Sequence, residues 1–175
     1  MELATTQDLL EVLRRYDIVE QAQMALVSEQ PQSRLHRSPN RVIQALINHR
    51  WLTPFQAKRI LNGRAENLRL GPYVLIDRLG SGGMCHVFKA RHTKLGLVAA
   101  LKCLRREQRE EPVIVERFRR ETRLLMQLSH PNVVRAFHTS NDPGIPFIAM
   151  EHVSGTDLSL LVREQGPLLP EVECE

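Results

Sequence analysis

Residues 73–90 read YVLIDRLGSGGMCHVFKA, and this stretch decides the fold of the chain. Both of its ends, 73–79 and 87–90, are rich in strand-forming residues and follow a period of two. A glycine-rich turn joins them, and a third segment of the same kind follows at 97–102. Because the connections are short, the sequence predicts an antiparallel meander of three strands.

The turn from Gly80 to Val87 has the spacing G-x-G-x-x-G-x-V, with Cys85 in place of the last glycine. Glycines let a backbone approach a polyphosphate and present its amides without obstruction by side chains. A dinucleotide-binding turn has similar spacing but requires a helix directly after it, whereas residues 87–90 continue as a strand, so that interpretation fails. A plain hairpin with extra glycines stays open for the turn taken alone.

A lysine and a glutamate on neighbouring elements are expected to pair. Lys102 shares one strand face with Val98 and Ala100, where an ammonium needs a partner or must reach past the strand edge to solvent. Pro112 opens a helix, and Glu121 interrupts its otherwise apolar stripe, which consists of Ile114, Phe118, Leu125 and Leu128. We expect this carboxylate to be buried and to neutralise Lys102; the alternative is a solvated charge at the edge of the stripe.

Two more strands are expected after this helix, at 133–137 and 146–151. The predicted second part of the chain is therefore a five-stranded antiparallel sheet with one helix inserted before its last two strands.

The first part of the chain has a helical pattern. Apolar residues recur at three-and-four spacing between Leu9 and Leu26, which predicts two short amphipathic helices. Ser38 before a proline predicts the start of a third helix, and Thr53 with Gln56 predicts a capping box at the start of a fourth. Gly63 is expected to end that fourth helix.

The expected fold class is therefore α+β, with a small helical bundle at residues 1–66 and a second domain at residues 67–175.

Five motifs in a fixed order make residues 70–165 similar to the amino-terminal lobe of protein kinases, specifically the bacterial eukaryotic-like serine/threonine kinases. They are the glycine loop with Val87, Ala100-Leu101-Lys102, Arg117-Phe118-Arg119-Arg120-Glu121, Leu128-Ser129-His130-Pro131-Asn132-Val133-Val134, and Phe147-Ile148-Ala149-Met150-Glu151-His152-Val153. The inserted helix then corresponds to the αC helix of that lobe, and His130 to a structural residue of the loop after it.

The resemblance implies that ATP binds beneath the glycine loop. Lys102 would contact the α and β phosphates while Glu121 positions it. The other residues that the resemblance assigns to nucleotide binding are Leu79, Gly80, Ser81, Gly82, Gly83, Met84, Cys85, Val87, Ala100, Met150, Glu151, Val153 and Asp157.

Some of these residues receive individual roles from the same resemblance. Val87 and Ala100 would enclose the adenine ring, Met150 would be the gatekeeper, and Glu151 and Val153 would offer hinge hydrogen bonds. Asp157 would reach the ribose, although an ordinary acid at the start of the next helix is the alternative.

The 175 residues contain neither the His-Arg-Asp catalytic loop nor the Asp-Phe-Gly motif that the family uses to hold Mg²⁺. We therefore expect a member of the serine/threonine kinase family whose carboxyl lobe is missing, with no catalytic base and no metal ligands. Such a chain would bind ATP weakly and transfer no phosphate by itself. The alternative function is a non-catalytic interaction or regulatory module, with a missing lobe or another protein as its partner.

Other classes of function find little support. The net charge is only +4, so nucleic-acid binding is not expected, although short helices and the segment 38–41 leave a DNA-binding alternative. No apolar run approaches the ~18 residues that a membrane span requires. Three cysteines without C-x-x-C spacing favour a reducing, cytoplasmic location and no metal site, with a redox role for Cys85 as a minor alternative.

Overall fold

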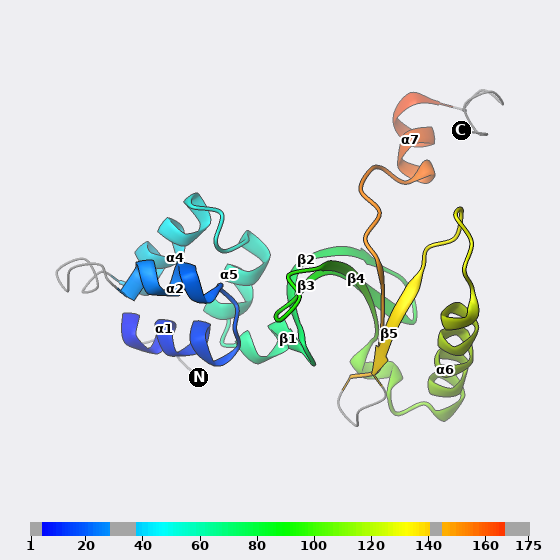
Figure 1. The fold of residues 1–175 in the computed structure, drawn as a ribbon, viewed down its shortest axis with the longest axis horizontal. Helices are drawn as coiled ribbons and strands as arrows, with labels where there is room; N and C mark the ends of the chain where they lie inside the picture. Colours follow the sequence, from blue (N-terminus) through cyan, green and yellow to red (C-terminus); the bar gives the residue numbers. More distant parts are fainter. Residues whose placement is uncertain (1–4, 29–37, 141–144, 167–175) are drawn as a thin grey trace.

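The computed structural model describes residues 5–28, 38–140 and 145–166. Cys174, one of the three cysteines considered above, lies outside these residues. Figure 1 shows the helices of the first part at one end, a curled sheet in the middle and a long helix at the other end.

Within the described residues four α-helices precede the sheet, as the sequence predicted. They are α1 (Thr6–Arg15), α2 (Gln21–Ser28), α4 (Pro39–Asn48) and α5 (Pro54–Leu61). The capping box is present at α5, where Thr53 accepts from the Gln56 backbone and Gln56 accepts from the Thr53 backbone. Ser38 is the N-cap residue of α4, but its side chain makes no capping hydrogen bond. Gly63 follows α5 with φ 66°, in the region where glycine is favoured.

All strands of the sheet are antiparallel, in the order β1-β2-β3-β4-β6-β5. Their bounds are β1 (Arg69–Leu70), β2 (Tyr73–Ser81), β3 (Cys85–His92), β4 (Val98–Leu104), β5 (Ala136–Ser140) and β6 (Phe147–Glu151). The remaining elements are the short 3₁₀ helices η1 (Ala65–Leu68) and η2 (Arg106–Gln108) and the helices α6 (Pro112–Gln127) and α7 (Leu158–Gln165).

In the part of the chain that the structure describes, the sheet has six strands, so the predicted count of five was wrong by one. The additional strand β1 contains two residues, which pair with Tyr73 and Val74 across a turn at Gly71. Two residues are too few to show a period of two, and no other local pattern indicates a strand there.

Strand β5 also begins later than predicted. Val133 and Val134 precede it and are 37% and 40% exposed, and the Val133 backbone bonds back to His130 in a turn. A pair of β-branched residues thus occurs in a loop here, because strand propensity depends on what the side chains can pack against.

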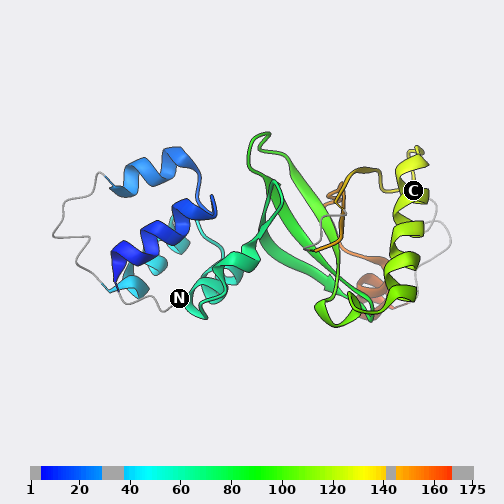
Figure 2. The same ribbon diagram turned by 90° about the horizontal axis from the view of Figure 1, so that it is seen from below.

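The two faces of the sheet are covered by different parts of the chain. Residues paired across strands share a face, and one face carries Cys85, Leu104 and Ile148, which pack with Phe118 of α6. We call this the α6 face. The opposite face carries Phe88, Leu101, Cys103, Phe147 and Ala149, which belong to one buried cluster with residues of the amino-terminal helices. Figure 2 shows the amino-terminal helices on one side of the strands and α6 on the other.

Helix α5 is bonded directly to strand β2. The buried Gln56 side chain donates from Nε2 to the Leu75 carbonyl at 2.8 Å, and Thr53 Oγ1 donates to the Ile76 carbonyl at 2.6 Å. Ile76 lies at an irregularity in the pairing of β2 with β3, where a strand carbonyl needs another donor. The Phe55 ring packs against Phe88 of β3, with ring centroids 6.0 Å apart. The helical segment therefore shares one core with the sheet, and the predicted boundary at residues 66 and 67 stays a prediction.

None of the helices in the described ranges is both long enough and apolar enough to cross a membrane.

Candidate functional site

The α6 face of the sheet holds an ion pair. Lys102 lies in β4 opposite Val87 of β3 and Ile148 of β6, and its Nζ donates a hydrogen bond to Oε1 of Glu121 in α6. This contact is the one that the sequence predicted. The side chains are 23% and 39% exposed, so Glu121 is half-buried and not buried as expected.

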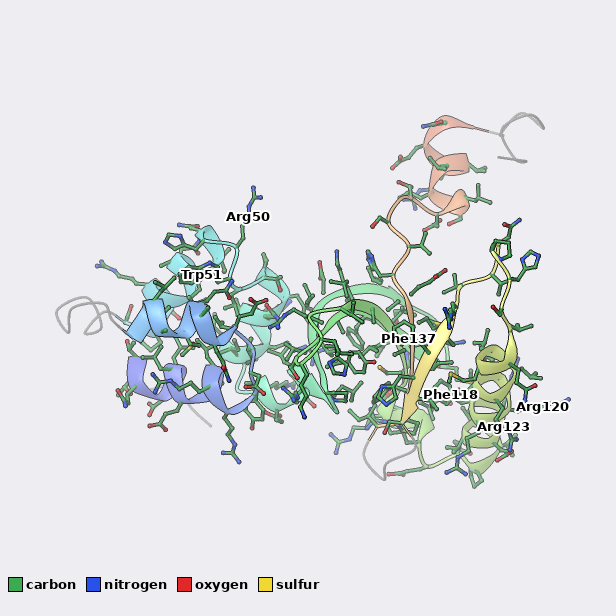
Figure 3. All side chains as sticks on the ribbon, in the orientation of Figure 1. Arg50, Trp51, Phe118, Arg120, Arg123 and Phe137 are labelled. Carbon is green, nitrogen blue, oxygen red and sulfur yellow. The ribbon has the colours of Figure 1, made fainter. Side chains whose placement is uncertain are left out.

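Helix α6 positions Glu121 through one large anchor. Phe118, one turn earlier, is 2% exposed and lies between the helix and the sheet, whereas Arg120 points away from the sheet (Figure 3). Ile114 and Leu125 are half-buried against the same cluster. The fourth predicted apolar position, Leu128, follows the helix and is 49% exposed. The stripe is therefore shorter than predicted, which leaves the Glu121 side partly open to solvent.

The glycine-rich loop connects β2 and β3, and the Gly82 amide donates to the Cys85 carbonyl at 2.9 Å. A Cβ added to Gly80 or Gly83 would have no neighbouring atom within 4 Å, and on Gly82 its nearest neighbour would be 3.9 Å away. None of the three has a positive φ. The fold itself therefore does not require glycine at these positions, and their open surroundings suit close approach by a ligand.

Several predicted nucleotide-binding residues share the face of Lys102. Val87 pairs with Lys102, and Met150 pairs with Ala100, so all four side chains lie on the α6 face, together with Cys85. The rest of the predicted loop, residues 79–84, covers the end of β2 and the turn that leads to β3. Its exposed residues are Leu79, Ser81, Gly82 and Gly83.

The predicted hinge residues lie further along the chain. Glu151 pairs with Ala99 and is on the opposite face, and Val153 is 68% exposed after the end of β6. Asp157 is the N-cap of α7, where its Oδ1 accepts from the Leu160 amide at 2.9 Å. Its bonds to Ser159 and Leu160 lower the pKa of the carboxyl. The alternative of an acid at a helix start is thus confirmed, while the contact with ribose stays a prediction.

Cys85 and Cys103 are free, buried thiols on neighbouring strands. Burial raises the pKa of Cys85, and it raises the pKa of Cys103 to about 12. A thiol with a raised pKa is a poor nucleophile at neutral pH, which does not favour a redox role for Cys85.

Metal ligands do not gather in the described part of the chain, where no three His, Cys, Asp or Glu side chains are placed to hold an ion. Within those described residues, therefore, no set of carboxylates is placed to hold Mg²⁺, and phosphate binding by Lys102 and the glycine loop stays a prediction.

A polar cluster on the other side of the glycine loop was missed by the sequence analysis. Arg105 Nη2 donates to Ser81 Oγ at 2.6 Å, and His86 Nδ1 lies 3.1 Å from the same oxygen. The alternation of side chains along a strand predicts that His86 and Cys85 lie on opposite faces of the sheet. The contact of Arg105 with Ser81 depends in addition on how β2, β3 and β4 pair, which the sequence does not show.

Comparison with known proteins gives consistent results. A probable serine/threonine-protein kinase of Streptomyces coelicolor is 40% identical over 121 residues, which cover 67% of this chain and 17% of that protein. The serine/threonine-protein kinase PknH of Mycobacterium bovis is 39% identical over 100 residues, covering 57% of this chain and 17% of PknH. The chain thus spans about a sixth of the length of these relatives.

Among solved structures, the PknI kinase domain of Mycobacterium tuberculosis matches with a TM-score of 0.49 and 28% identity, covering 59% of this chain and 42% of that domain. The family model described as protein kinase domain matches residues 73–175, which is more than half of the chain. The glycine loop, the lysine–glutamate pair and this match agree, and the chain belongs to the protein kinase family, with bacterial serine/threonine kinases among its relatives.

Proposed function

We propose that residues 73–166 act as the ATP-binding part of a serine/threonine protein kinase. The observation that carries the proposal is the Lys102–Glu121 pair on the same sheet face as Val87 and Ala100, next to a loop whose glycines the fold does not require. The pair holds an ammonium at a fixed place where it can neutralise phosphate oxygens.

In this proposal the parts of the site have separate tasks. The loop amides approach the triphosphate, Lys102 contacts its α and β phosphates, and Val87 with Ala100 forms one apolar wall for adenine. The residues 150–153 carry the hinge hydrogen bonds, and Asp157 contacts the ribose.

Phosphoryl transfer to a protein serine or threonine is the activity that we propose for the whole kinase. It depends on a catalytic aspartate and on Mg²⁺ ligands that the 175 residues do not contain. We therefore expect a polypeptide of these residues to transfer no phosphate by itself. We also expect it to bind ATP weakly, because the second wall of the adenine site would belong to the carboxyl lobe of the kinase.

Nucleotide binding is tested by titrating the ¹⁵N-labelled chain with a non-hydrolysable ATP analogue. We expect amide shifts concentrated at residues 79–87, 102 and 150–153, with a dissociation constant of about 1 mM. Lys102→Met should abolish most of these shifts, whereas Lys94→Met, in an exposed turn, should leave them unchanged. Shifts that are the same in the Lys102 and Lys94 variants would contradict the proposal.

A non-catalytic interaction role is the second candidate, and an exposed apolar surface favours it. Four apolar side chains from the end of α6 to the start of β5 are 37% to 49% exposed: Leu128, Val133 and Val134 in the connection, and Phe137 in β5. Such a group indicates contact with another protein or with the rest of a kinase domain. Size-exclusion chromatography tests it: self-association that Phe137→Ser and Val134→Ser abolish supports this role, and a monodisperse monomer counts against it.

We also infer a cytoplasmic location from the two free, buried thiols, since such thiols persist in a reducing compartment.

A further inference from the structure

Three basic side chains surround Ser81 on the side of the glycine loop that faces away from Lys102. Ser81 pairs with His86, and His86 pairs with Cys103, so these residues lie on the opposite face of the sheet from Cys85. Arg105 donates from Nη2 to Ser81 Oγ at 2.6 Å. Arg78 Nη2 lies 3.0 Å from the His86 Nδ1 atom, which is itself 3.1 Å from Ser81 Oγ.

The hydrogen bonds of the His86 ring indicate which of its nitrogen atoms carries a proton. A guanidinium can only donate, so Nδ1 of His86 accepts from Arg78 and carries no proton. Burial, together with the nearby Arg78 and Arg105, lowers the pKa of His86. The cluster is therefore arranged around a neutral histidine and two permanent positive charges.

Positive charge exceeds negative charge in this cluster. Among the described residues, neither Arg78 nor Arg105 is within salt-bridge distance of a carboxylate. Arg59 of α5 adds a further positive charge near His86, while Glu107 of η2 is the acid that acts on it.

Two further details concern the same arginines. Asp77 accepts a bond from the Arg78 backbone and not from its side chain. The Nε atom of Arg105 is buried and has no hydrogen-bond partner. Arg105 bonds the Ser81 hydroxyl while its own Nε donor is unused, and Arg78 is linked to that hydroxyl only through His86. The two guanidinium groups can therefore receive more acceptor oxygens than Ser81 supplies.

We propose that Ser81 is a phosphorylation site and that Arg78, His86 and Arg105 form the receptor for the attached phosphate. A phosphate monoester brings about two negative charges and three acceptor oxygens to a position already bonded to Arg105. In the modification, Ser81 Oγ forms a bond to the γ-phosphorus of ATP and the β–γ bridging bond breaks. ADP leaves, and the hydroxyl proton passes to solvent; a serine/threonine kinase acting on this chain is the catalyst.

Such a phosphate would fix the loop to the far side of the sheet. Ser81 and the two glycines after it are exposed, and the Gly82 amide is bonded only within the loop turn. A phosphate held by Arg105, which follows β4, would join the loop to a second strand. The inference does not rest on ATP binding by this chain, because the receptor faces away from Lys102.

The receptor is tested by incorporating phosphoserine at position 81 during synthesis and following the His86 ring by NMR. We expect the titration midpoint of His86 to rise by at least about one pH unit, because a nearby dianion favours the imidazolium. Phosphoserine at the exposed position Ser129 is the matched control and should leave the midpoint unchanged. Equal midpoints in the two phosphorylated chains would overturn the proposal.

Two further measurements separate the sources of phosphate and the contribution of the arginines. Arg105→Gln in the chain with phosphoserine at 81 should remove at least half of the midpoint shift, and a full shift without Arg105 would contradict its role. Inorganic phosphate at about 50 mM should not reproduce the shift when the ionic strength is kept constant with chloride. The same shift with inorganic phosphate in a Ser81→Ala chain would assign the site to free phosphate and overturn the covalent proposal.

The modification is tested by mass mapping of the protein isolated from its own cells. A phosphorylated peptide containing Ser81 is expected in a part of the population, and an unmodified Ser81 in all samples across growth conditions would overturn this step.

Discussion

Lys102 of β4 donates a hydrogen bond to Glu121 of α6, and this contact joins the middle of the sheet to the helix that packs on it. Both side chains retain access to solvent, so the pair does not resemble a buried ion pair whose loss would unfold the protein. Its importance is the fixed position that it gives to the ammonium of Lys102.

Glu121→Gln should therefore weaken nucleotide binding more than it weakens the fold. We expect the free energy of unfolding to change by less than about 1 kcal/mol, because exposed ion pairs contribute little. Affinity for an ATP analogue should fall about three- to tenfold as Lys102 loses its fixed position. Urea unfolding and NMR titration measure the two effects. Glu116→Gln, which removes the exposed partner of Arg123, is the control, and an equal loss of affinity there would refute the prediction.

Gln56→Ala should destabilise the protein by about 1–3 kcal/mol, because it leaves the buried Leu75 carbonyl without its donor and breaks the capping box of α5. Gln44→Ala is the control: Gln44 bonds Asn48 on the exposed side of α4, so its loss should cost less than about 0.5 kcal/mol. Urea unfolding compares them. Equal stability of the two variants would show that α5 is not held to β2 by this bond.

The contrast between Lys102 and Gln56 shows what the sequence could and could not predict. A strand and a helix with clear periods place Lys102 and Glu121 on facing surfaces, so their contact followed from local patterns. Gln56 was predicted as a capping residue, and it is one. Its second bond, to Leu75, depends on how the helical segment packs on the sheet, and no local pattern carries that information.

The shorter features were also beyond local patterns. Strand β1 has two residues, and its pairing depends on the turn at Gly71. The Ser81 cluster requires the register of three strands, which periodicity alone does not fix.

Phe118→Ala should destabilise the protein by about 3–5 kcal/mol, because this 2% exposed ring anchors α6 to the sheet. Phe137→Ala removes the same ring from a position that is 42% exposed on β5, so we expect a cost below about 1 kcal/mol. Chemical denaturation measures both, and Figure 3 shows the two rings. If the Phe118 variant is unfolded in buffer while the Phe137 variant is folded, the order still holds; equal costs would contradict it.

Cys85 and Cys103 should react slowly with iodoacetamide in the folded protein. The thiolate is the reactive form, and burial raises the pKa of both thiols, so less thiolate is present at a given pH than in the unfolded chain. At pH 8 we expect alkylation of each to be at least about tenfold slower than in urea, with Cys103 the slower of the two. Mass spectrometry of the individual peptides measures the rates. Labelling of folded Cys85 at the rate seen in urea would restore a reactive role for it.

The start of α7 should show a titration that belongs to Asp157. Its Oδ1 accepts from the Leu160 amide, and its bonds to Ser159 and Leu160 lower the pKa from the ordinary value of 3.8. Because the pKa is lowered in the folded protein, the cap stabilises the helix fully at pH values above the ordinary pKa. This stabilisation is lost as the pH falls through the lower pKa of the folded state. The amide shift of Leu160 should therefore titrate with a midpoint below 3.8, and Asp157→Asn should remove the titration while α7 stays helical at neutral pH, since asparagine also caps helices. A midpoint at or above the ordinary value would mean that the carboxylate is not held by the helix start, and Asp157 would then be free for the ribose contact proposed above.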